Sequence, residues 1–85
     1  MIYCIAVLKS RTMVYELADA LSYGGLQYSI INTPTRAHIG CGLSIKFSCP
    51  YKSRVEEICF NKGLSGHVAF YRVENSGLSM SVTRI

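Results

Sequence analysis

The stretch Ile2-Tyr3-Cys4-Ile5-Ala6-Val7-Leu8 decides the fold, because its side chains are apolar or aromatic throughout and leave the segment without a polar face. A run of this kind is typical of a central strand that is covered on both sides of a sheet. Lys9 and Ser10 follow it and end the strand. We therefore expect residues 2–8 to form a strand in the interior of the sheet.

A helix is predicted directly after this strand. Ser10 is a good N-cap residue, and Gly24-Gly25 can end the helix by supplying a left-handed C-terminal cap. Between them, apolar side chains recur at three- and four-residue spacing, which places them on one face of a helix. This apolar stripe consists of Met13, Val14, Leu17, Ala18 and Leu21.

A second helix is expected before Gly63, and the sequence offers two places for it to begin. It begins near Cys49-Pro50 if Ser48 caps it, or near Arg54 if Ser53 and Glu56 form a capping box. Both alternatives stay open. The inward-facing residues of this helix are Val55, Ile58 and Cys59.

Further strands are expected at residues 27–32, 42–48 and 67–73, and Pro34 stops the first of these by lacking a backbone donor. In the strand at 42–48, the apolar residues Leu43, Ile45 and Phe47 share one face, whereas Ser44 and Lys46 lie on the other. A last strand is indicated at 78–83, where apolar and hydroxyl side chains alternate. It can pair with the preceding strand or with an edge of another chain, and the local hairpin is favoured.

The resulting order of elements, βαββαβ, predicts an α+β fold of the ferredoxin-like, split βαβ type. Its antiparallel sheet carries two helices on one face. Residues 1–74 form this domain, and residues 75–85 add a C-terminal β-strand extension to it. With 85 residues, the chain has room for one small domain.

Composition narrows the functional class. Hydrophobic residues make up 49% of the chain and charged residues 16%, which favours a folded protein over disorder. The sequence lacks both an apolar run long enough for a bilayer and a signal-like leader, so we expect a cytoplasmic protein without a membrane partner. The net charge of +4 is spread along the chain and no RNP-like aromatic motif accompanies it, so nucleic acid is not expected as a partner.

The four cysteines are expected to be reduced thiols, because the sequence has no secretory context. Cys4 and Cys59 fall on buried stripes, where cysteine usually acts as a small hydrophobe. A bond between Cys41 and Cys49 is not expected, since the strand between them would hold them too far apart. His38 and Cys41 have the spacing of a metal-ligand pair, but no second pair completes a site, so neither metal nor cofactor is expected.

Cys41 is the candidate reactive residue. Gly40 and Gly42 flank it and leave the sulfur accessible, and their backbone can form an anion-binding nest. Arg36 and His38 precede it in the same loop and can support a thiolate electrostatically. In the alternative interpretation Cys41 is structural and merely begins the following strand, because its parity matches the buried face of that strand.

The same region resembles a known family. A Thr33-Pro34 turn, Arg36, then Cys41-Gly42 and a strand that ends in Lys46-Phe47 are similar to DUF3343, a family of small bacterial and archaeal domains described as selenium or sulfur carrier protein-like. The resemblance covers residues 2–73. Thr35 is an extra residue, residues 38–40 replace a serine-like run, and the tail at 75–85 extends past the usual family end.

The resemblance implies a carrier rather than an enzyme with its own turnover. Cys41 would accept sulfur or selenium from a donor protein as a persulfide or selenosulfide and pass it to an acceptor protein, without a cofactor. Arg36 and His38 would favour the anionic form, and Gly40 and Gly42 would give access. The alternative is a non-enzymatic interaction or ligand-binding module with a structural Cys41. It would be a homodimer, because two helices leave one side of the central strand to be covered.

Overall fold

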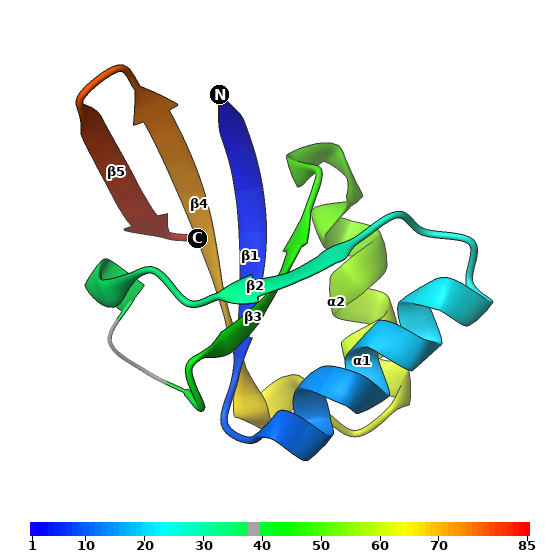
Figure 1. Ribbon diagram of the computed structural model, residues 1–85. Coiled ribbons are helices and arrows are strands. Elements are labelled where there is room, and N and C mark those ends of the chain that lie inside the picture. Colours follow the sequence, from blue (N-terminus) through cyan, green and yellow to red (C-terminus); the bar gives the residue numbers. More distant parts are fainter. Residues whose placement is uncertain (38–39) are drawn as a thin grey trace.

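The computed structural model describes residues 1–37 and 40–85, which form a five-stranded antiparallel sheet with both helices on one face (Figure 1). The strands lie in the order β2-β3-β1-β4-β5, so β1 is central. The predicted ferredoxin-like fold with an additional C-terminal strand is confirmed. Its strands and helices are β1 (Ile2–Leu8), α1 (Arg11–Tyr23), β2 (Ser29–Asn32), β3 (Leu43–Phe47), α2 (Lys52–Asn61), β4 (Val68–Ser76) and β5 (Ser79–Arg84), joined in part by the 3₁₀ turns η1 (Thr35–Ala37), η2 (Cys49–Tyr51) and η3 (Ser65–His67).

The first helix begins and ends where the sequence predicts. The Ser10 side chain caps α1 by accepting a hydrogen bond from the Met13 amide at 3.3 Å. Gly25 adopts φ +74° just after the helix, as the left-handed termination requires. The inner face of α1 packs on the sheet through the completely or nearly completely buried residues Val14, Leu17, Ala18 and Leu21.

The second helix follows the first of the two alternatives in outline. The chain turns at η2, which begins at Cys49 with Pro50 in its first turn, and α2 continues from Lys52. Ser48 does not act as expected, because its side chain makes no capping bond, and Tyr51 at the start of α2 makes none either. The helix is therefore held by packing, with Val55 and Cys59 buried against the sheet.

The limits of β2 and β4 differ from those expected from the sequence. β2 begins at Ser29 rather than at residue 27, and β4 continues to Ser76 rather than ending at 73. His67 belongs to η3 and not to the strand. β5 pairs with β4 through a hairpin in which Ser76 faces Ser79, so the predicted local hairpin is confirmed.

The sheet face opposite the helices, here called the second face, is covered by the chain itself. Ile5, Val7 and Val73 on this face are at most 2% exposed, and they pack with Ala37 of η1. Met80 and Val82 of β5 also contact this cluster. In Figure 1, η1 and β5 lie on the left of the sheet and the helices on the right. This burial removes the reason for which the sequence favoured a homodimer.

Two polar residues of β3, Ser44 and Lys46, lie on the second face and are at least partly buried there. Ser44 is fully buried, and its hydroxyl lies 2.6 Å from that of Thr33. Lys46 is half-buried, with its ammonium 4.5 Å from the centre of the Tyr3 ring. The polar side chains of β3 are thus included in the packing of the second face, Ser44 against Thr33 and Lys46 against Tyr3.

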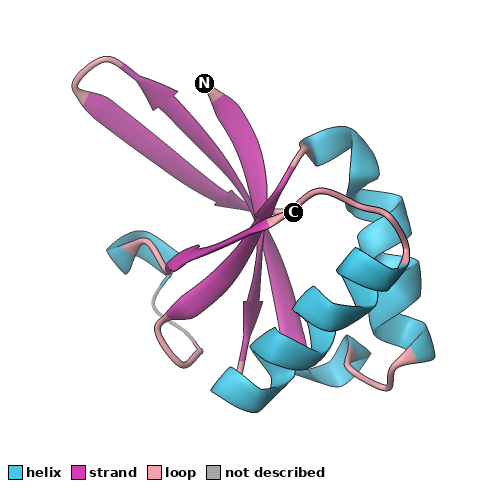
Figure 2. Cartoon of the chain, turned by 45° about the vertical axis from the view of Figure 1, so that its right-hand side comes forward, coloured by secondary structure: helices cyan, strands magenta, loops and turns pink. Residues whose placement is uncertain are grey.

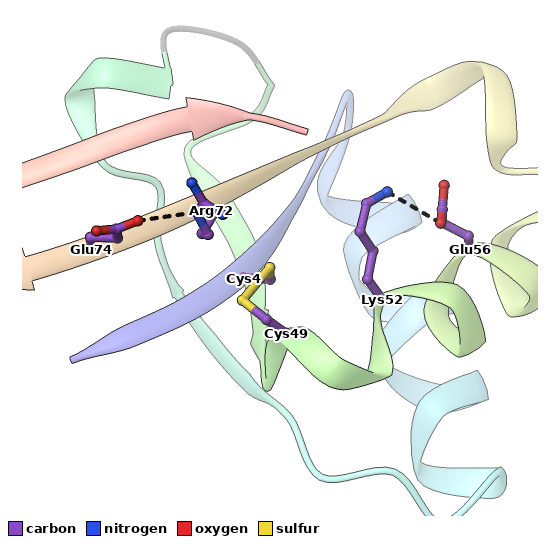
Figure 3. Close-up of a disulfide and its surroundings, with 6 residues drawn as sticks. All are labelled: Cys4, Cys49, Lys52, Glu56, Arg72 and Glu74. Carbon is purple, nitrogen blue, oxygen red and sulfur yellow. Dashed lines mark hydrogen bonds and ion pairs between the residues drawn. A yellow bond between two sulfur atoms is a disulfide. The ribbon is translucent and has the colours of Figure 1, made fainter.

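A disulfide joins Cys4 of β1 to Cys49 of η2 (Figure 3). The expectation that all cysteines are reduced was therefore wrong. In the antiparallel register Cys4 faces Phe47, so the chain that leaves β3 passes directly over Cys4, and the two Cα atoms are 5.0 Å apart. Disulfides persist mainly in oxidising compartments, so this bond does not favour the cytoplasmic location expected from the sequence. Cys4 and Cys59 are buried, as predicted.

Candidate functional site

The Cys41 loop, residues 33–42, connects β2 to β3 at the end of the sheet where β1 finishes. Its base is closed by the Thr33 amide, which donates to the Gly42 carbonyl at 2.8 Å. The bonded hydroxyls of Thr33 and Ser44 reinforce this closure from the buried side. The two ends of the loop are thus fixed to each other, and Cys41 lies on a connection with rigid ends.

Gly40 brings the loop against the end of β1. The Cys41 amide donates to the Leu8 carbonyl at 3.3 Å. Gly40 has φ +93°, and a Cβ atom on it would lie 2.6 Å from the Leu8 carbonyl oxygen and 2.8 Å from Val7 Cγ1. Only a glycine allows this approach, both for its backbone angle and for its lack of a side chain.

Gly42 has almost the same φ as Gly40 but lies in a different environment. Its φ is +92°, but a Cβ atom there would meet nothing within 4 Å. The residue is exposed. Gly42 is therefore needed for the turn into β3, and it leaves open space on that side of Cys41.

Cys41 is a free, half-buried cysteine. Its side chain packs against the core cluster under the helices, and Sγ lies 3.9 Å from the Leu43 carbonyl oxygen. Cys4 and Cys49 are bonded to each other. Cys59 is free but buried, and burial together with the negative charge of Glu56 raises the pKa of its thiol to about 11. Of the four cysteines, all of which are described, Cys41 is the free one with exposed surface.

The other predicted site residues are placed as follows. Arg36 lies on η1, and its Nη1 atom donates to the Met80 carbonyl of β5 at 2.8 Å. The contact that the structure gives to Arg36 is therefore with the opposite edge of the sheet. His38 lies outside the described residues.

The described residues contain neither a metal-ligand cluster nor a helix that could span a membrane. Across residues 1–37 and 40–85, no three His, Cys, Asp or Glu side chains come together as a metal site would require. No helix in the same ranges combines the length and apolarity that crossing a membrane requires.

A comparison with known protein families assigns this chain to one of them. A family model described as "Putative Se/S carrier protein-like" matches residues 3–68. The chain belongs to this family. The part of the chain shared with the Se/S carrier-like family includes the Cys41 loop and both helices, whereas nearly all of β4 and the whole of β5 lie beyond it. Comparisons with curated proteins and with solved structures gave no match.

In this member of the Se/S carrier-like family, a basic hollow of about 210 Å³ borders the Cys41 loop. Gly40 lines it together with three residues that can carry positive charge, namely Lys9, His67 and Arg84. These three were not among the predicted site residues, because they are far apart in sequence. The feature of the sequence that could have pointed to them is the predicted topology. It brings the end of β1, the starts of β3 and β4 and the end of β5 to one end of the sheet.

Proposed function

We propose that this protein of the Se/S carrier-like family carries sulfur or selenium on Cys41, as a persulfide or a selenosulfide, and transfers it to an acceptor protein. The observation that carries the proposal is that Cys41 combines a free thiol with exposed surface, within the part of the chain that the family model matches. The sulfur atoms of the other three cysteines are bonded or buried.

Loading is a thiol exchange that needs no external oxidant. The Cys41 thiolate attacks the terminal sulfur of a persulfide on the donor protein, and a new S–S bond forms. The donor's own S–S bond breaks, and its electron pair leaves with the donor thiolate, which takes up the proton. Delivery is the same exchange with an acceptor thiolate, and it returns Cys41 to the thiol. A selenosulfide donor transfers selenium in the same way.

The surroundings of Cys41 suit such an exchange. Attack requires the Cys41 sulfur to lie in line with the donor S–S bond that breaks, so the donor needs the open space beside Gly42 in order to approach. The closed loop base at Thr33 and the approach of Gly40 to Leu8 limit the movement of Cys41. Arg36 contributes by holding η1, which precedes the cysteine, against β5. The protein acts as a carrier, and turnover belongs to its donor and acceptor partners.

The proposal is tested by loading the protein with a cysteine desulfurase and cysteine, followed by mass spectrometry of peptides under non-reducing conditions. We expect an addition of about 32 Da on the peptide that contains Cys41, which is the mass of one sulfur atom. Cys41→Ser should take up no sulfur. Cys59→Ser is the matched control, because it removes a free thiol that is buried, and it should load like the natural chain.

Delivery is measured by mixing the loaded and repurified protein with a small thiol acceptor and following the loss of the added mass. An unmodified Cys41, beside a known persulfide carrier that is labelled in the same reaction, would overturn the proposal. Sulfur found equally on Cys59 would also overturn it, because loading would then not depend on the Cys41 loop.

A further inference from the structure

We propose that the basic hollow beside the Cys41 loop is a binding site for a small oxyanion, of the kind that sulfur and selenium form. The hollow is defined by Lys9, Gly40, His67 and Arg84, with apolar walls from β1 and β4. Oxyanion binding as such is independent of the proposed carrier function. The choice of sulfur and selenium oxyanions rests on that function.

Charge of one sign gathers in the hollow from Lys9 and Arg84, and His67 lies beside them. Lys9 follows β1, His67 ends η3 and Arg84 ends β5, and the described residues that line the hollow include no Asp or Glu. The ion pairs found among the described residues join Lys52 to Glu56 and Arg72 to Glu74, and neither involves Lys9 or Arg84 (Figure 3). The positive charges at the hollow are thus not neutralised by a carboxylate within the described part of the chain.

His67 provides an independent observation. Its Nδ1 atom is buried and has no hydrogen-bond partner among the described residues. Buried polar atoms in native proteins are nearly always paired, with protein, water or ligand. His67 also lines the hollow, and a rotation of its ring that brings a protonated Nδ1 toward the hollow would let this atom donate to an oxygen of a bound anion.

The walls and the size of the hollow favour a small ion. Val7, Leu8, Val68 and Ala69 line it, and apolar walls strengthen the attraction between the basic groups and an anion. Its volume of about 210 Å³ lies below the range of roughly 300–1,000 Å³ that is usual for sites of drug-sized ligands. An inorganic oxyanion fits such a space.

A second hollow in the molecule serves as a comparison. It lies between α1 and α2, has a volume of about 380 Å³ and is also lined by basic residues, Arg54 and Lys62. Asp19 and Glu57 line it as well, so positive and negative charges are mixed there. Lys62 therefore offers a control for the simple loss of one positive charge.

The site is tested by titrating the ¹⁵N-labelled protein with sodium sulfate, selenate or phosphate at pH 7, with chloride keeping the ionic strength constant. We expect saturable shifts of the Gly66 and Val68 amides and of the His67 ring. Lys9→Gln and Arg84→Gln should each weaken sulfate binding about tenfold, because each loses a charge-assisted contact. Lys62→Gln should change it less than about twofold, as expected for an exposed charge that does not line the hollow. The amide spectra also show whether each variant is folded.

Absence of saturable shifts, or equal weakening by Lys62→Gln, would overturn the proposal. If phosphate binds as tightly as sulfate and selenate, the hollow is still an oxyanion site, but its assignment to sulfur and selenium oxyanions is overturned. Cys41→Ser should bind sulfate normally, although it cannot be loaded. If sulfate binds and Cys41 of the natural chain takes up no sulfur, the carrier function fails and the oxyanion site stands.

Discussion

Gly40 and Gly42 flank Cys41 with nearly the same positive φ, yet they face different surroundings, so substitution separates two effects. Gly42→Ala introduces only backbone strain, which costs about 1–2 kcal/mol. Gly40→Ala adds a clash with the Leu8 carbonyl and Val7, which should raise the cost by a further ~1–3 kcal/mol. Urea unfolding of the two variants measures the difference. Equal losses of stability would show that the loop does not lie against β1 as described.

Cys59 gives the stability of the protein a dependence on alkaline pH. Burial and Glu56 raise the pKa of its thiol from the ordinary 9.0 to about 11, so the folded protein holds this proton more tightly than the unfolded chain. The resulting stability is complete below pH 9 and is lost as the pH rises toward 11. We expect the stability advantage over Cys59→Ala to shrink by roughly 2 kcal/mol between pH 8 and 11.

The measurement for Cys59 is urea unfolding of the natural chain and of Cys59→Ala across that pH range. Tyrosines and lysines titrate in both proteins, so the difference between the two curves isolates the thiol. Parallel curves would contradict the raised pKa.

At the scale of single residues, the sequence indicated the features that depend on near neighbours. The glycines around Cys41 and the burial of Cys59 are of this kind. The partner of Arg36 is 44 residues away, and that of Cys4 is 45 residues away. Such contacts are set by strand register and by the twist of the sheet, and neither can be read from local sequence patterns.

At the scale of elements, the apolar stripe predicted α1 and alternation predicted β3 and β5, because burial of one face imposes these periods. The start of α2 was not fixed by capping residues. It is fixed where η2 is bonded to β1 through Cys4 and Cys49. This bond joins residues 45 apart in the sequence, so a local capping pattern contains no information about it.

The disulfide should therefore contribute strongly to stability. It closes a loop with a sequence separation of 45 residues, and the chain-entropy model gives about 4 kcal/mol for a loop of that size. Adding a reductant should lower the urea midpoint of the natural chain and leave that of Cys49→Ser unchanged. A thiol assay on the unfolded, unreduced protein should find two free thiols. Four free thiols in protein purified without reductant would contradict the bond.

At the scale of the whole molecule, the two edges of the sheet close over its second face. η1 follows the edge strand β2, and β5 is the opposite edge, so the hydrogen bond from Arg36 to Met80 joins one edge to the other. Figure 2 shows the strong twist of the strands that brings these segments toward each other. Because β5 lies beyond the part matched by the family model, this closure uses an element outside the shared region.

Removal of the Arg36 side chain should loosen this closure without unfolding the sheet. One hydrogen bond to an exposed carbonyl contributes about 1 kcal/mol, so Arg36→Ala should lose roughly that much stability. Hydrogen exchange should become faster in β5 and stay unchanged in α1, which packs on the other face. Arg72→Ala is the matched control, because its ion pair with Glu74 is exposed on both sides and should contribute less than about 0.5 kcal/mol. If β5 exchanges at the same rate in both variants, the second face is held by the apolar contacts of Ile5, Val7 and Val73 and does not depend on Arg36.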